Sequence, residues 1–128
     1  MLFLELFDGS GHDFPELTTV LDDELLDYMK DHLDGFPSFQ SMGHLDREED
    51  TLVDEPLREG LWSELAELSS QVQRRLLPTP PSWVGLRDLE DLRLGEEFGW
   101  AGLSDFLSRL QRLLTLARKP GVELWISG

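Results

Sequence analysis

The sequence contains no cysteine, which excludes disulfide bonds, Cys-based zinc sites and thiol nucleophiles. It also has no run of the roughly 18 apolar residues that a membrane-spanning helix requires. The opening residues 1–7 lack the basic flank of a secretory signal and reach acids at Glu5 and Asp8. We therefore expect a cytoplasmic protein that does not bind membranes.

Basic residues are scarce, and the shortage is confined to the first half of the chain. The net charge is −15. Residues 1–60 hold seventeen acids against three bases, a balance of −14, whereas residues 61–128 hold nine acids against eight bases, a balance of −1. Such a field repels nucleic acid and anionic membranes and attracts basic proteins. The expected partner is a basic protein, and no nucleic acid is expected to bind.

Motifs for nucleotide binding and covalent catalysis are also missing. The chain has neither a Walker A loop nor a dinucleotide-binding glycine fingerprint, and no Gly-x-Ser-x-Gly elbow. Ser10, His12 and Asp13 supply the residue types of a catalytic triad, but they are crowded into one turn. We expect no catalytic residues and no cofactor.

The sequence offers only weak metal-binding patterns. His12, His32 and His44 sit among acids, but none forms the i, i+4 His pair that a helical metal site uses. The acidic stretch from Asp46 has no glycine at the sixth place of a calcium loop, whether the loop starts there or at Asp50. Solvated surface side chains are the interpretation that we prefer.

The chain has enough apolar residues to fold around one core. Forty per cent of its 128 residues are hydrophobic, including four Trp and seven Phe. This composition can offset the conformational entropy lost on folding, and the length suits one domain. We expect a single acidic domain over residues 1–128.

Hydrophobic periodicity in the first half predicts a strand followed by a helix. Residues 2–7 alternate in the manner of a strand and precede a turn at 8–11. A helix start at Asp13–Glu16, with a second possible start at 22–24, leads into a helical stripe from Leu17 to Leu33. Residues 38–60 suggest a short strand and then an exposed acidic loop.

In the second half, the periodicity predicts two more helices and a final strand. Residues 61–77 and 103–117 have helical spacing, 78–81 form a proline-rich connector, and 122–126 resemble a strand. Residues 83–94 fit either a helical turn or a short strand. The predicted fold is therefore α+β, with about three helices packed on a small sheet that contains the N- and C-terminal strands.

The acidic face of the first half is the main candidate for a function. Its charge could serve only for solubility, or it could bind a basic partner, because complementary fields speed encounter and suppress wrong pairings. Trp62 or Trp83 could supply an aromatic anchor, although burial in the core is the commoner role for Trp. The candidate partner-binding residues are Asp22, Asp23, Glu24, Asp27, Asp31, Asp46, Glu48, Glu49, Asp50 and Asp54.

In size, acidity, lack of cysteine and mixed helix-strand layout, the chain resembles the bacterial immunity proteins that neutralise a cognate toxin. The residues that carry the resemblance are the stretch Phe98-Gly-Trp-Ala-Gly-Leu-Ser-Asp-Phe-Leu, which runs into the last predicted helix, and the strand 122–126. The resemblance implies a non-enzymatic inhibitor that occludes a basic toxin site, and it identifies no site residue.

Two other classes of function stay open. A structural or adaptor subunit of a larger assembly would use the Leu-rich helices 61–77 and 103–117 as its contact surface. A small metal-dependent enzyme would use His12, His32 or His44 with neighbouring carboxylates.

Overall fold

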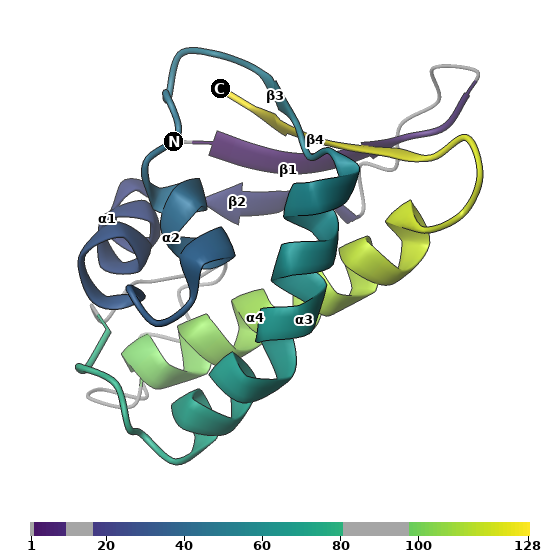
Figure 1. Ribbon diagram of the computed structural model, residues 1–128. Helices are drawn as coiled ribbons and strands as arrows, with labels where there is room; N and C mark the ends of the chain where they lie inside the picture. The colour runs from purple at the N-terminus through teal and green to yellow at the C-terminus, as the bar shows by residue number, and fades with distance from the viewer. Residues whose placement is uncertain (1, 10–16, 81–97) are drawn as a thin grey trace.

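The computed structural model describes residues 2–9, 17–80 and 98–128, and it confirms the predicted α+β class. Over these ranges the chain forms four helices and one four-stranded antiparallel sheet (Figure 1). The prediction of about three helices was therefore one helix short. In chain order the elements are β1 (Leu2–Phe7), β2 (Thr19–Leu21), α1 (Asp23–His32), α2 (Pro37–Gly43), β3 (Thr51–Leu52), α3 (Glu55–Gln73), α4 (Phe98–Ala117) and β4 (Glu123–Ser127).

The first and last strands share one sheet, as the sequence predicted, and the structure places them side by side at its centre. The strand order is β2-β1-β4-β3, and every neighbouring pair is antiparallel. Leu4 of β1 lies opposite Ile126 of β4, and both are fully buried. Because side chains alternate along a strand, this register directs one set of residues from both strands into the core.

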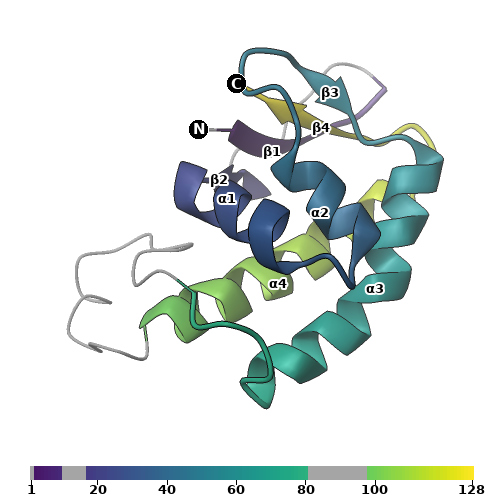
Figure 2. The same ribbon diagram turned by 60° about the vertical axis from the view of Figure 1, so that its left-hand side comes forward.

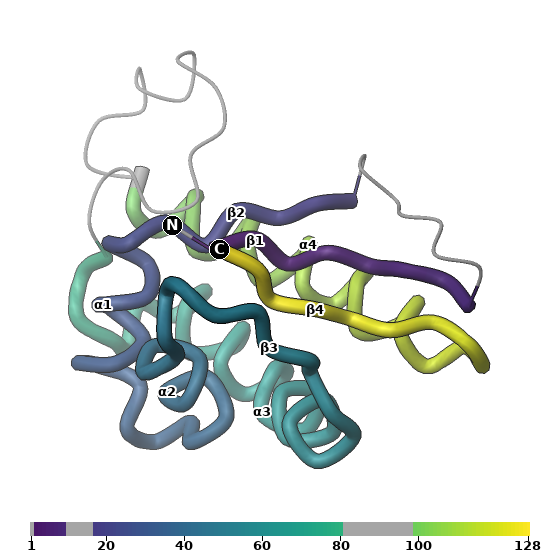
Figure 3. The backbone as a smooth tube through the Cα atoms, turned by 90° about the horizontal axis from the view of Figure 1, so that it is seen from above, coloured from purple at the N-terminus to yellow at the C-terminus, as the bar shows by residue number. Residues whose placement is uncertain are grey.

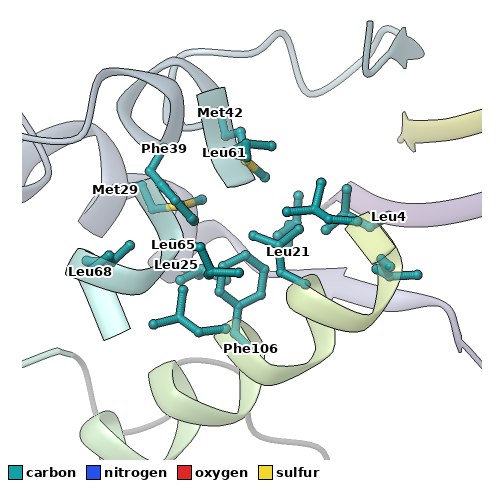
Figure 4. Close-up of a cluster of buried hydrophobic side chains, with 14 of the residues drawn as sticks. Leu4, Leu21, Leu25, Met29, Phe39, Met42, Leu61, Leu65, Leu68 and Phe106 are labelled. Atoms are coloured by element: carbon teal, nitrogen blue, oxygen red, sulfur yellow. The ribbon is translucent and has the colours of Figure 1, made fainter. Parts of the chain in front are cut away.

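All four helices pack on one face of the sheet, as the views in Figures 1 and 3 agree. The core fills the space between the two layers, with residues from every helix and from the inner face of the sheet (Figure 4). Burying each large apolar side chain contributes about 1.5–3 kcal/mol. Residues that meet in the close-up include Leu4, Leu21, Leu25, Met29, Phe39, Met42, Leu61 and Phe106.

The predicted short strand after residue 38 is wrong, because this segment forms helix α2. Phe39 and Met42, three residues apart, are both fully buried, which is the spacing of one helical face. The helix has no side-chain cap of its own. Instead, the Glu64 carboxylate of α3 accepts hydrogen bonds from the backbone N–H groups of Ser38 (3.0 Å) and Phe39 (3.5 Å). This cap comes from a distant segment, so local sequence patterns do not show it.

The exposed acidic loop is confirmed over residues 46–50, where each of the four acids is exposed. The strand of this region follows the loop, at β3, and pairs with β4 at the edge of the sheet.

The helical stripe predicted from Leu17 is wrong over Thr19–Leu21, which form the edge strand β2. Leu21 lies opposite Leu2 of β1, so strand pairing uses apolar residues that also fitted a helical spacing. The second predicted start is confirmed, because Asp22 caps α1. The first predicted start, Asp13–Glu16, lies outside the described residues.

The two long helices are confirmed with earlier starts than predicted, and α3 ends at Gln73, before the predicted end at residue 77. Helix α3 begins at Glu55, where Asp54 is the cap and a proline occupies the first turn, and helix α4 begins at Phe98. Segment 83–94 lies outside the described residues. Among the helices that are described, none combines the length and apolarity needed to cross a membrane.

Candidate functional site

Helix α1 carries the first group of predicted site residues. Its N-terminus is fixed by Asp22, whose Oδ1 accepts a hydrogen bond of 2.8 Å from the backbone N–H of Leu25. Leu25, Leu26, Tyr28 and Met29 are buried against the core. The opposite face therefore turns its acids outward, and Asp23, Asp27 and Asp31 are exposed.

Arg47 connects the acidic loop to α1. Its guanidinium lies 3.2 Å from Asp23 Oδ1 and 2.7 Å from Asp27 Oδ1. The side chains of Asp23 and Asp27 keep exposed fractions of 54% and 52%, so both carboxylates still face solvent. Of the predicted site residues, the structure thus brings these two together with the loop that carries Asp46. We call α1 and loop 46–50 the acidic surface.

Lys30 also lies within the acidic surface. Its Nζ is 3.8 Å from Asp27 Oδ1, so the two bases of this region both approach the same carboxylate. Exposed pairs of this kind contribute about 0–1 kcal/mol each. They reduce the negative charge of the surface locally without removing it, because the acids outnumber them.

The loop itself has a defined local turn. Asp46 Oδ1 accepts a hydrogen bond of 2.9 Å from the backbone N–H of Glu48, an arrangement typical of Asp in turns. Glu48 and Glu49 are exposed. The geometry presents several carboxylates to solvent on a short and locally ordered segment.

Two predicted site residues also cap helices. Asp22 caps α1, and Asp54 caps α3 by accepting a hydrogen bond of 3.0 Å from the backbone N–H of Leu57. Such caps stabilise a helix by about 1 kcal/mol. These hydrogen bonds give both residues a role in the fold that does not require a partner.

A shallow pocket of about 270 Å³ lies beside α1. The hydroxyl of Tyr28 donates a hydrogen bond of 2.7 Å to the backbone carbonyl of Pro78, and burial raises the pKa of Tyr28 to about 12. The Tyr28 ring lies 5.2 Å from the ring of His32. The lining residues are Glu24, Asp27, Tyr28, Asp31, His32 and Thr79.

The described histidines do not assemble with acids into a metal site. His32 and His44 are both exposed, and within residues 2–9, 17–80 and 98–128 no three His, Asp or Glu side chains are grouped to hold a metal ion. His12 lies outside these ranges.

The Leu-rich faces of the long helices are buried inside the molecule. Leu61, Leu65 and Leu68 of α3 and Leu110 and Leu114 of α4 all belong to the core. These faces are therefore not available as the contact surface predicted for an assembly subunit. Trp62 is half-buried against the same core, with the guanidinium of Arg118 3.9 Å from its ring centroid. Trp83 lies outside the described residues.

The outer face of the sheet was missed by the sequence analysis. Asp50 lines a second shallow pocket there, of about 620 Å³, with Trp125. Trp125 alternates with the buried Leu124 and Ile126, so it points away from the core. This alternation is visible in the sequence and could have placed Trp125 on the outer face.

Comparisons with known proteins give no relative for this arrangement: no protein-family model, no curated protein and no solved structure matches the chain.

Proposed function

We propose that this protein is an acidic protein-binding domain of the immunity or inhibitor type, which neutralises a cognate bacterial toxin by occluding its basic active site. In this proposal it acts in the cytoplasm by binding and catalyses no reaction. The observation that carries the proposal is the acidic surface itself: most of the excess charge of the chain lies in residues 1–60, and α1 and loop 46–50 present their carboxylates to solvent.

Electrostatics favours a binding role over a purely solubilising one. Concentrating a charge of −14 in sixty residues costs self-repulsion that a dispersed pattern would avoid. A compact negative surface in turn raises the rate of encounter with a basic cleft and disfavours acidic partners. Arg47 holds the loop against α1, so that both segments can meet one partner together.

The experiment is a pull-down with the purified chain from a lysate of its source organism at low and at high salt, with retained proteins identified by mass spectrometry. We expect a single basic protein, retained at low salt and weakened at high salt. A loop variant, Asp46→Asn, Glu48→Gln and Glu49→Gln together, should retain much less of it.

A matched control removes the same charge elsewhere. Glu55, Glu67 and Asp105 are exposed residues of α3 and α4, and their replacement by Gln, Gln and Asn should leave retention near the wild-type level. Equal retention by the loop variant and the control would contradict the proposal.

A second candidate, a structural or adaptor subunit of a larger assembly, is favoured by the apolar residues on the outer face of the sheet. It predicts a complex that survives high salt, because apolar contacts are not screened by ions. Recovery of such a salt-insensitive complex would favour the subunit over the inhibitor.

A further inference from the structure

No helix in the described part of the chain covers the outer face of the sheet (Figures 1 and 3), and this face carries several apolar side chains. Strand alternation places Phe3, Phe7, Val20 and Trp125 on this face. All four are partly exposed and lie outside the core cluster. Leu52 of the edge strand lies opposite Trp125 and exposes 41% of its surface. We call these five residues the outer sheet face.

Carboxylates lie among these apolar residues on the same side of the sheet. Glu5 lies directly opposite Trp125 in the strand register, and its Oε2 accepts a hydrogen bond of 3.4 Å from Ser127. Asp50, at the end of the acidic loop, lines the same pocket of about 620 Å³ with Phe7 and Trp125. An indole ring and two carboxylates are thus grouped around one open space.

No cation of the described residues fills this space. Neither Glu5 nor Asp50 forms an ion pair with a lysine or arginine of residues 2–9, 17–80 and 98–128. Neither does any described cation lie over the Trp125 ring. Within the described part of the chain, the pocket therefore has the acceptors of a cation site and no cation between them.

The chain contains an internal example of the completed arrangement. On α3 and after α4, the Arg118 guanidinium lies 3.9 Å from the Trp62 ring centroid, and its Nη2 is 3.4 Å from Glu59 Oε2. Indole, carboxylate and guanidinium there form one cluster. A planar guanidinium suits both partners, because it stacks on an aromatic ring and pairs with a carboxylate at its edge.

We propose that the Glu5–Asp50–Trp125 pocket receives an arginine side chain of the partner protein, with its guanidinium on the Trp125 indole and its charge facing Glu5 and Asp50. The apolar residues beside the pocket, Phe3 and Val20, would cover adjacent apolar side chains of the same segment. This inference rests on the proposed function and extends it, since Asp50 joins the acidic surface to the outer sheet face.

Charge decides against a second copy of this chain as the occupant. Stacking two outer sheet faces would bring two sets of Glu5, Asp50 and Glu123 together in molecules of net charge −15. Like charges in such contact are destabilising. A segment with an arginine among apolar residues removes this repulsion and uses both features of the face.

The test is an NMR titration of the full chain with N-acetyl-arginine amide, compared with N-acetyl-citrulline amide, its uncharged analogue of nearly equal shape. The indole N–H signal of Trp125 is assigned with Trp125→Phe. We expect the arginine probe to shift this signal and the backbone amides around Glu5 and Asp50. The citrulline probe should shift them little.

Variants locate the binding. Glu5→Gln with Asp50→Asn keeps the shape of the pocket and should weaken the arginine probe about tenfold, while the loop variant at Asp46, Glu48 and Glu49 should leave it unchanged. Asp50→Asn alone, in an exposed loop, provides a variant with little risk to folding, and we expect an intermediate loss.

Equal shifts with both probes, shifts confined to α1, or unchanged affinity in the pocket variants would overturn the inference. If the pocket does not bind arginine but partner binding still depends on the loop acids, the results contradict this inference and support the proposed function. If the pocket binds arginine but no salt-sensitive basic partner is found, the results support an arginine site and contradict the proposed function.

Discussion

At the scale of single residues, Gly43 allows the backbones of two helices to approach closely. A Cβ atom at this position would lie 2.5 Å from the backbone nitrogen of Lys30 and 2.6 Å from the carbonyl oxygen of Leu26. Both atoms belong to the backbone of α1 and cannot turn aside. Helices α1 and α2 pack together at this point (Figure 2).

We expect Gly43→Ala to lower the free energy of unfolding by about 2–3 kcal/mol, because the clash exceeds the modest helical preference for alanine. Urea unfolding followed by circular dichroism measures this change in the free energy of unfolding. Gly35→Ala is the control, since a Cβ there meets nothing within 4 Å, and it should change stability by less than about 0.5 kcal/mol. Equal stability of the two variants would refute this account of the helix contact.

Tyr28 gives a prediction for alkaline pH. Burial raises its pKa from 10.0 to about 12, so above pH 10 the unfolded chain releases the phenol proton while the folded chain retains it. The unfolded state then becomes favoured, and the free energy of unfolding falls by about 1–2 kcal/mol as pH rises from 10 to 12. Below pH 10 this contribution is fully present.

Tyr28→Phe removes the titrating group, and its unfolding free energy should decline less between pH 10 and 12, as measured by urea unfolding at each pH. The variant also loses the hydrogen bond to Pro78. This loss lowers its free energy of unfolding by an amount that is nearly the same at every pH. Parallel curves for the variant and the wild type would show that Tyr28 is not responsible for the alkaline loss.

At the scale of elements, α2 depends on a cap from another helix. Glu64 of α3 accepts hydrogen bonds from the Ser38 N–H at 3.0 and 3.1 Å. We expect Glu64→Ala to destabilise the protein by about 2 kcal/mol, since it leaves backbone donors at a helix N-terminus without their charged acceptor. Thermal or urea unfolding measures this loss.

Glu67→Ala is a suitable control for the Glu64 variant. Glu67 lies one turn further along α3, is exposed, and bonds only Gln71 in the same helix, so its loss should cost less than about 0.5 kcal/mol. Glu64→Gln keeps one acceptor oxygen and should fall between the two. A Glu64→Ala variant as stable as Glu67→Ala would contradict the interhelical cap.

How far the sequence predicts these elements depends on where their stabilising contacts lie. Strands β1 and β4 were predicted because their alternation is local, and α3 and α4 because their apolar stripes are long. The short elements β2 and α2 were not, because β2 is fixed by pairing with β1 and α2 by the distant Glu64. Contacts between distant segments leave no local periodicity to read.

The candidate site, like the fold, was predicted only where its features are local in the sequence. The acids of α1 and of loop 46–50 could be identified from charge and helical spacing. Arg47, which joins them, and the pocket that Asp50 shares with Trp125 depend on tertiary contacts. Asp22 and Asp54 were grouped with the site by charge alone, whereas their hydrogen bonds show that they cap helices.

At the scale of the whole molecule, charge and apolar surface have separate locations. The helices lie on one side of the sheet (Figures 1 and 3), where α1 exposes its acids to solvent. Strand alternation places the aromatic side chains of the outer sheet face on the opposite side. Loop 46–50 connects the two, because Arg47 contacts α1 and Asp50 lines the sheet pocket. A partner that uses both would gain a charged rim and an apolar centre, the usual anatomy of a protein interface.

The most direct test of the central claim is the salt dependence of affinity for the basic protein retained in the pull-down. Calorimetric titration between about 50 and 300 mM salt, a range over which the Debye length shortens about 2.5-fold, gives the slope of affinity against salt. We expect the control variant, with Glu55, Glu67 and Asp105 replaced by Gln, Gln and Asn, to retain the wild-type slope. The variant at Asp46, Glu48 and Glu49 should bind about tenfold more weakly at low salt, with a flatter slope. If both variants keep the wild-type affinity and slope, the acidic surface does not bind the partner.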